Sequence, residues 1–157
     1  MKTLRLYNFG FQGFTGMSLA PRDIVDFASA LATYVEGGQI VVGRDTRYSS
    51  PMVYSAAISG LLSAGCDIID LGICPTPLVQ FAVRHYGASA GVSISGGHKQ
   101  AGWNSLNMIN SDGSIFDPLS GQAVLDIFHS KEFLRSDWQG MGKVTQSDSF
   151  YKSHLLN

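Results

Sequence analysis

Apolar residues recur three and four positions apart in three successive stretches of the chain, which is the spacing of one face of an α-helix. A proline stands in the first turn of each stretch and a glycine follows its end, as is typical of helix boundaries. In the second and third stretches, Ser50 and Thr76 precede the proline and are expected to cap the helix. The predicted helices are residues 21–36, 50–64 and 76–87.

Short apolar runs rich in β-branched residues lie between and after these helices. A run of this kind between two helical patterns is typical of a buried strand in a parallel sheet. The predicted strands are residues 39–43, 67–71 and 90–95. Because strands that alternate with helices favour right-handed crossovers, the sequence predicts an α/β fold, a three-layer α/β/α sandwich with a mixed, mainly parallel sheet.

The alternation changes after Trp103. Residues 106–109 are largely apolar, 111–113 carry a turn signal, and 114–116 resume the apolar run. This pattern predicts an antiparallel hairpin at the edge of the sheet. A last helix is expected over residues 120–130.

The end of the chain is expected to lead out of this domain. Residues 131–142 are polar and interrupted by glycine, as in a linker, whereas 147–156 carry the pattern of another capped helix. A helix that begins so late has little to pack on. We therefore expect one α/β/α domain over 1–142 and, over 143–157, a linker and the start of a helix leading to a second domain.

Composition excludes several classes of protein. Hydrophobic residues make up 45% of the 157 residues, which excludes charge-rich disorder. Charged residues are only 15%, against about 25% in ordinary soluble domains, as expected where a domain exposes surface to a neighbour. A net charge of -1 gives no basic surface for nucleic acid. With no apolar stretch long enough for a membrane and no signal-peptide core, we expect a cytoplasmic protein with no membrane partner.

Two cysteines, Cys66 and Cys74, are too few for a disulfide framework or a zinc site. Each lies in or beside an apolar run, so both are expected to be buried free thiols. Walker loops, G-x-S-x-G elbows and Cys/His clusters are absent from the sequence, so no metal site is expected within this chain.

Loops after strands carry the candidate chemistry, because ligands bind at the carboxyl ends of strands in open α/β sheets. Residues 43–50 place Arg44 and Arg47 just before the amino end of a helix, which favours anions and indicates phosphate binding. The alternative is that Asp45 pairs internally with an arginine and Ser50 only caps the helix. The sequence leaves both interpretations open.

Two further loops contain closely spaced glycines. In residues 95–99, glycines allow a close approach of the backbone to a ligand, while His98 and Lys99 add polar and cationic groups. A lone histidine is more often a hydrogen-bonded structural residue than a catalyst. Residues 9–16 have a glycine at every third position, which suits a tight backbone path but is not a dinucleotide-binding fingerprint.

Five segments of the chain, taken in order, resemble one known family. Residues 41–50, V-V-G-R-D-T-R-Y-S-S, are nearly identical to its V-G-R-D-T-R-x-S-S segment, and residues 72–77 are similar to its G-x-x-x-T-P turn. Residues 9–16 resemble its opening F-G-T-S-G-x-R-G, 95–99 stand where its phosphoserine loop T-A-S-H-N-P belongs, and 103–107 match the W-N-A-L-K that follows. The family is that of the α-D-phosphohexomutases, which includes phosphoglucomutase, phosphomannomutase and phosphoglucosamine mutase, and the match is to the first domain.

The resemblance implies a parent protein of four domains that binds Mg²⁺. It implies transfer of phosphate between the C1 and C6 hydroxyls of a hexose phosphate, through a phosphoserine and a bisphosphorylated intermediate. The first domain would supply the serine, while the Mg²⁺ ligands, the sugar-selecting residues and most phosphate contacts belong to the missing domains. The expected partners are therefore a hexose phosphate and those domains, and this chain alone is expected to be inactive, with no cofactor of its own.

The chain departs from the family at three functional positions. Gly97 stands where the family has its nucleophilic serine, Asn107 where it has a lysine acting as general acid/base, and Thr15 where it has an arginine. Glycine has no hydroxyl, so no phosphoenzyme is expected at that position. A displaced nucleophile, Ser93 or Ser95, is the less favoured alternative because strand alternation puts both on one strand face rather than at the loop tip.

No catalytic residue is therefore assigned. The substrate-binding residues that the resemblance implies are Arg44, Ser95, His98 and Lys99. Two functions stay open: the first domain of an intramolecular phosphotransferase of carbohydrate metabolism, or a non-catalytic sugar-phosphate-binding or regulatory domain.

Overall fold

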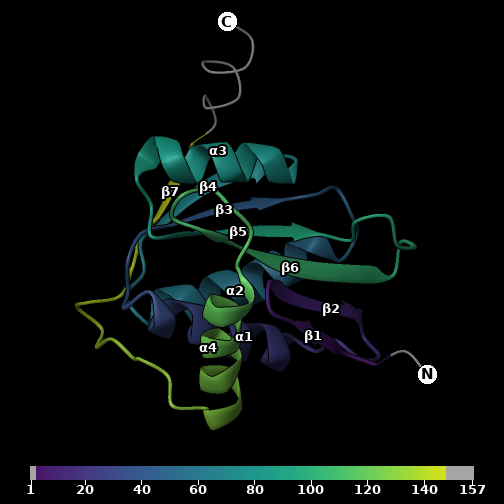
Figure 1. Cartoon of the computed structure of the whole chain (residues 1–157), viewed down its shortest axis with the longest axis horizontal. Helices are drawn as coiled ribbons and strands as arrows, with labels where there is room; N and C mark the ends of the chain where they lie inside the picture. The colour runs from purple at the N-terminus through teal and green to yellow at the C-terminus, as the bar shows by residue number, and fades with distance from the viewer. Residues whose placement is uncertain (1–2, 148–157) are drawn as a thin grey trace, which may run out of the picture.

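The computed structural model describes residues 3–147, which form a seven-stranded sheet between two helical layers (Figure 1). This arrangement confirms the predicted three-layer sandwich and its mixed sheet. In chain order the elements are β1 Arg5–Tyr7, β2 Gly10–Phe14, α1 Pro21–Tyr34, β3 Ile40–Arg44, α2 Ser50–Ser63, β4 Ile68–Ile73, α3 Thr76–Tyr86, β5 Ala90–Ser95, β6 Trp103–Asn110, α4 Pro118–Ser130 and β7 Val144–Gln146.

The strand order across the sheet is β1-β2-β6-β5-β3-β4-β7. Strands β5, β3, β4 and β7 run parallel to their neighbours among these four, whereas β1, β2 and β6 pair antiparallel. The predicted edge hairpin is therefore misplaced, because β6 lies between β2 and β5. Its expected second strand is reduced to a single bridge between Ile109 and Ile115. The antiparallel edge is instead the β1–β2 hairpin, which the glycine spacing did not predict.

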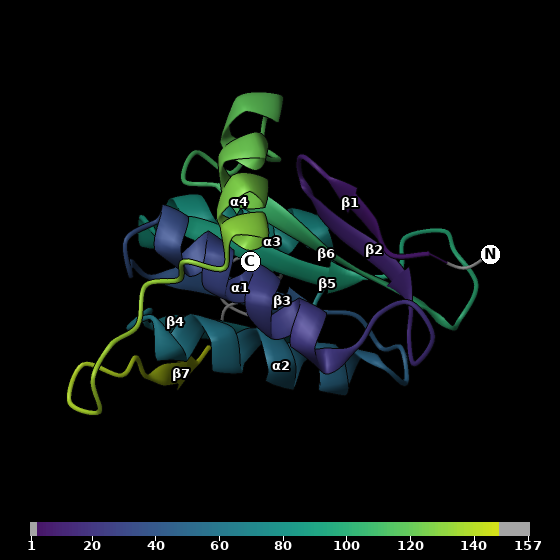
Figure 2. The ribbon, with the colours of Figure 1, turned by 90° about the horizontal axis from the view of Figure 1, so that it is seen from below.

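Helices α1, α2 and α4 cover one face of the sheet, and α3 covers part of the other (Figures 1 and 2). Strand alternation divides the core between the two faces, since Ile40 and Val42 of β3 face α1 and α2 while Val41 faces α3. Gly60 lets α2 pack closely on α1, because a Cβ there would lie 2.6 Å from the carbonyl oxygen of Val25. The larger core lies under the three-helix face.

Both predicted helix caps are wrong, because each hydroxyl has a partner elsewhere. Ser50 lies inside α2 and its Oγ donates to Asp45, while Thr76 Oγ1 lies 2.6 Å from Ser93 Oγ on β5. A side-chain cap is present on α4 instead, where Asp117 accepts hydrogen bonds from two backbone amides at 2.9 and 3.0 Å.

Strand β7 extends the sheet beyond residue 142, where the sequence places the end of the domain. It pairs parallel with β4, and Gln146 Nε2 donates to Asp70 Oδ2 at 2.9 Å. The domain boundary itself stays a prediction, since residues 148–157, and with them nearly all of the expected helix over 147–156, lie outside the described residues.

Cys66 and Cys74 are buried and unpaired, as predicted. Burial raises the pKa of the Cys66 thiol to about 12 and that of Cys74 to about 11. Both thiols are therefore protonated and unreactive at neutral pH.

Candidate functional site

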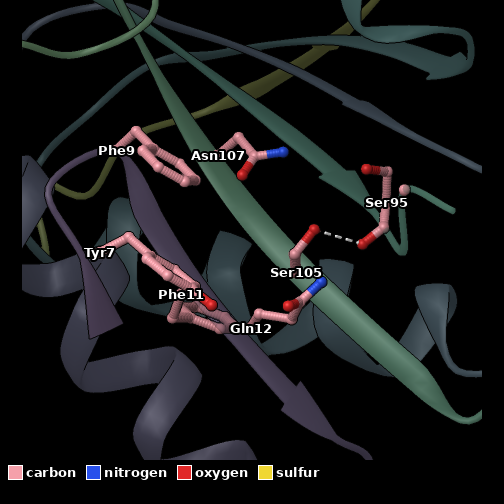
Figure 3. A pocket seen from close by; sticks show the side chains of 8 residues that line it. Tyr7, Phe9, Phe11, Gln12, Ser95, Ser105 and Asn107 are labelled. Atoms are coloured by element: carbon pink, nitrogen blue, oxygen red, sulfur yellow. Dashed lines mark hydrogen bonds between the residues drawn. The ribbon is translucent and has the colours of Figure 1, made fainter. Parts of the chain in front are cut away.

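A cavity of about 300 Å³ opens on the α3 side of the sheet, over strands that α3 leaves uncovered (Figure 3). Helix α3 packs over the parallel strands and the end of β6, so the face of β1, β2 and the rest of β6 is open beside it. We call this cavity the Gly97 pocket. It is lined by Tyr7, Phe9, Phe11, Gln12, Ser95, Gly97, Ser105 and Asn107.

Strand register brings these distant residues together. Gln12 of β2 lies opposite Ser105 of β6, which lies opposite Ser95 of β5. In the neighbouring row, Asn107 of β6 lies opposite Ser93 of β5. Because residues directly opposite each other share one face of a sheet, the polar side chains of three strands point into the same space.

Aromatic rings form one side of the Gly97 pocket. The rings of Tyr7 and Phe9 stack with their centroids 5.1 Å apart and their planes 6° apart, and Phe9 is 40% exposed. Phe11 is only 2% exposed and lies edge-on to Phe27 of α1. The hairpin that carries these rings is thus anchored in the main core.

The rest of the lining is polar and uncharged. Ser105 Oγ donates to the carbonyl oxygen of Ser95 at 2.6 Å (Figure 3). Within residues 3–147, the side chains of Gln12, Ser95 and Asn107 make no hydrogen bond. These groups are available to a ligand.

Gly97 lies in a tight turn at the end of β5. The Lys99 amide donates to the Gly96 carbonyl oxygen at 3.1 Å, which closes a four-residue turn with Gly97 and His98 in the middle. Gly97 has φ +55, in the left-handed region that favours glycine, yet a Cβ there would meet nothing within 4 Å. There is space for a side chain at this position, but the sequence places none.

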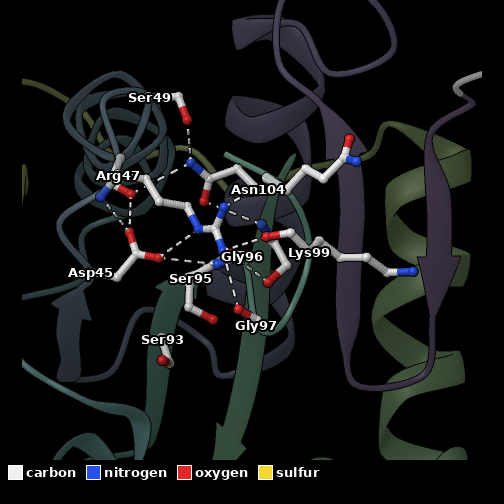
Figure 4. Close-up of polar contacts among 12 residues, drawn as sticks. Asp45, Arg47, Ser49, Ser93, Ser95, Gly96, Gly97, Lys99 and Asn104 are labelled. Atoms are coloured by element: carbon white, nitrogen blue, oxygen red, sulfur yellow. Dashed lines mark hydrogen bonds and ion pairs between the residues drawn. The ribbon is translucent and has the colours of Figure 1, made fainter. Parts of the chain in front are cut away.

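Arg47 holds this turn from the neighbouring loop (Figure 4). Its guanidinium donates to the carbonyl oxygens of Gly97 at 3.1 Å, Lys99 at 2.9 Å and Gln100 at 2.8 Å. A Cβ on Gly96 would lie 2.1 Å from the guanidinium carbon, so glycine is needed there. One arginine thus fixes most of the backbone of the turn.

Asp45 completes this connection. Its carboxylate accepts from Arg47 Nε and from the Gly96 amide, both at 3.1 Å, and from the Ser50 hydroxyl. Of the two interpretations of residues 43–50, the structural one is confirmed for the Asp45–Arg47 pair and wrong for the Ser50 cap, and phosphate binding by Arg44 stays a prediction. The guanidinium of Arg47 is therefore used to hold the turn in place.

Comparison with known proteins identifies the family. Residues 7–135 match the family model described as phosphoglucomutase/phosphomannomutase, alpha/beta/alpha domain I. The chain belongs to this family and corresponds to its first domain.

The chain is 37% identical to a probable phosphoglucosamine mutase of Pyrococcus abyssi, over 88% of this chain and 31% of that protein. It is 35% identical to a phosphoglucomutase/phosphomannomutase of Thermococcus kodakarensis, over 89% of this chain and 32% of that protein. The crystal structure of a family protein from Burkholderia thailandensis superposes with a TM-score of 0.76 at 24% identity, covering 92% of this chain and 34% of that one, and supports the fold alone. The chain thus spans about a third of the length of these relatives.

The structure brings together only some of the residues that the family resemblance singled out. Gly97, Asn107 and Ser95 line one pocket, and His98 and Lys99 are exposed on the turn beside it. Lys99 Nζ lies 5.9 Å from the centre of the Trp103 ring.

Arg44 lies on the other face of the sheet, toward α2. Its guanidinium is 5.5 Å from the centre of the Tyr54 ring, and it borders a separate recess of about 290 Å³ beside α2. Burial and a 2.7 Å hydrogen bond to Asp70 raise the pKa of Tyr54. The structure does not place Arg44 with Ser95 and Asn107, and Thr15 also lies outside their pocket.

Sequence reasoning missed Tyr7, Gln12 and Ser105. The alternation of polar and apolar residues over 105–108 carried a usable signal, because it marks a strand with one polar face. The sequence of β1 and β2 carried a weaker signal, since β1 has only three residues and glycines interrupt the alternation in β2.

Within 3–147, no three His, Cys, Asp or Glu side chains lie together as ligands for a metal ion. None of the helices in this part of the chain combines the length and the apolar character that crossing a bilayer requires.

Proposed function

We propose that this chain is the amino-terminal domain of a hexose-phosphate-binding family member and that it contacts the ligand without forming a phosphoenzyme. The observation that carries the proposal is the lining of the Gly97 pocket. Gly97 and Asn107 stand there at the positions that the family resemblance gives to a nucleophilic serine and a lysine. The open space above Gly97 then serves for binding only.

The neighbouring hydroxyls support a binding role. Ser93 is 2% exposed and its Oγ lies 2.6 Å from Thr76 Oγ1, so it does not reach the pocket. Ser95 does line the pocket, but among the described lining residues there is no histidine, carboxylate or lysine to take its proton. A serine without a base beside it is a weak nucleophile.

The second candidate is an intramolecular phosphotransferase on hexose phosphates, with Mg²⁺ held by another domain of a longer protein. Its support is the family itself, since the relatives are named as mutases at 35 to 37% identity. It requires a hydroxyl in this domain other than one at position 97.

Incubation of the longer parent protein with Mg²⁺ and glucose 1,6-bisphosphate, followed by mass spectrometry of the peptides from residues 1–157, separates the two functions. The binding role predicts no covalent phosphate on any hydroxyl, together with a rise in Tm in the presence of glucose 6-phosphate. Stable phosphate on Ser95 or another hydroxyl would establish the second candidate.

A charged variant tests whether the Gly97 pocket is the binding site. Asn107→Asp replaces the two N–H donors of the amide with a negative charge, so the rise in Tm with glucose 6-phosphate should become smaller, through the lost donors and through repulsion of a phosphate at the edge of the pocket. Asn110→Asp, on the same strand but outside the pocket, is the matched control and should keep it.

A further inference from the structure

The polar groups of the Gly97 pocket suit a ligand that can both donate and accept hydrogen bonds. Gln12 and Asn107 each present an amide with an oxygen acceptor and two N–H donors, and Ser95 presents a hydroxyl. None of these three side chains has a partner within the described part of the chain. A sugar hydroxyl can accept from the amide N–H groups and donate to the amide oxygens, whereas a phosphate group only accepts and would leave the amide oxygens without a donor.

The aromatic wall suits a sugar ring in shape. The stacked pair Tyr7 and Phe9 lines the pocket, with Phe9 40% exposed, and offers flat apolar surface to the C–H face of a pyranose. The cavity of about 300 Å³ is at the small end of ligand pockets, which span about 300 to 1,000 Å³. This is the space for one monosaccharide ring.

Cationic side chains lie around the pocket and not in it. Arg47 uses its guanidinium on Asp45 and three backbone carbonyls. Lys99 is on the exposed turn, and Arg5 lies on the edge strand opposite Gln12. A phosphate attached to a ring inside the pocket would lie at this cationic rim.

We propose that the Gly97 pocket binds the neutral, hydroxylated ring of a hexose, with any phosphate group of the ligand outside the pocket. This inference rests on the proposed function and specifies which part of the ligand the domain recognises. The site that the family resemblance assigns to phosphoryl transfer becomes, in this chain, a site for the sugar itself.

The test is an NMR titration of the backbone amides of the 157-residue chain with three probes: methyl α-glucoside, glucose 6-phosphate and inorganic phosphate. We expect methyl α-glucoside and glucose 6-phosphate to shift the amides of Gln12, Gly97 and Asn107 saturably, and inorganic phosphate to leave them in place. Any pattern in which the glucoside fails to shift these amides, or inorganic phosphate shifts them, overturns the inference. The result with glucose 6-phosphate tests the proposed function separately. The proposed function fails only if glucose 6-phosphate also leaves the pocket amides unshifted.

Two variants sharpen the test. Gln12→Ala should weaken binding of the glucoside about fivefold, the equivalent of one lost hydrogen bond, whereas the matched amide variant Gln122→Ala on α4 should not change it. Asn107→Lys places a cation among the amides, so inorganic phosphate should then shift the pocket amides. Equal glucoside affinity in Gln12→Ala and Gln122→Ala would contradict the assigned contacts.

Discussion

Arg47 shows how one side chain determines the shape of a loop that is distant in sequence. Its guanidinium reaches three carbonyl oxygens of the turn at 97–100, while Asp45 fixes its other side. Hydrogen bonds of a charged group are each worth more than hydrogen bonds between neutral groups. The turn thus depends on a residue of the preceding βα unit.

Arg47→Ala should therefore destabilise the fold by about 1 to 2 kcal/mol, since half-buried Asp45 loses its partner and the exposed carbonyl groups exchange the guanidinium for water. Urea denaturation gives the free energy of unfolding. Arg22→Ala, at an exposed position of α1, is the control and should change it by less than about 0.5 kcal/mol. Equal stability of the two variants would show that the Arg47 contacts contribute little.

The adjacent glycines of the turn should respond differently to substitution. Gly97→Ser meets open space and costs only the strain of a left-handed residue, about 1 to 2 kcal/mol. Gly96→Ala drives its Cβ into the Arg47 guanidinium and should cost more, because the whole set of Arg47 hydrogen bonds must shift. Thermal unfolding of both variants gives the order of their stabilities. A Gly96→Ala protein more stable than the Gly97→Ser protein would refute the prediction.

At the scale of elements, the sequence predicts the parts of the fold that follow a single regular period. Helices α1, α2 and α3 and strands β3, β4 and β5 all appear within a few residues of their predicted bounds. Strand β2 was missed because its glycines are required by backbone packing, as at Gly10, where a Cβ would lie 1.8 Å from the carbonyl oxygen of Leu106, and β1 has only three residues. A contact of this kind is made with a distant strand, so it leaves no periodic pattern in the sequence.

The candidate site was predictable only in part, for the same reason. Gly97 and Asn107 were singled out by the family resemblance, and strand register then brings them into one pocket. The sequence alone does not tell which arginine pairs with Asp45, nor that Arg44 and Ser95 point to opposite faces. Those outcomes depend on strand alternation and on partners from distant segments.

Strand β7 is a short strand at one edge of the described sheet. It has three exposed residues, and its side-chain anchor is Gln146 Nε2 on Asp70. Gln146→Ala should speed hydrogen exchange of the β7 amides by about fivefold, equivalent to one hydrogen bond, while exchange in β3 stays unchanged. Gln139→Ala, in the exposed segment before β7, should have no effect. Unchanged exchange in Gln146→Ala would mean that the backbone ladder alone holds the strand.

At the scale of the whole molecule, the buried thiols link stability to alkaline pH. Burial raises the thiol pKa from the ordinary 9.0 to about 12 for Cys66 and about 11 for Cys74, so the folded state disfavours the thiolates. The stability that this contributes is complete below about pH 9, the unfolded pKa, and is lost as the pH rises toward 11 to 12.

The free energy of unfolding should therefore fall between pH 9 and pH 11 more steeply in the natural chain than in the Cys66→Ala, Cys74→Ala double variant. Denaturation curves at several pH values compare the two slopes, and a pH-independent loss from the cavities left by the substitutions cancels in this comparison. Parallel slopes would show that the thiols do not titrate across the transition.

The position of β6 between β2 and β5 has a consequence for the order of events during synthesis on the ribosome. The β1–β2 hairpin has no strand to join until residues 103–110 have emerged, since β2 pairs with the rest of the described sheet through β6. Helices α1 to α3 and their parallel strands precede β6 and can assemble first, whereas contacts across so long a separation form slowly. Residues 7–12 are synthesised before most of the domain but pack among the last. The Gly97 pocket forms only when they have packed.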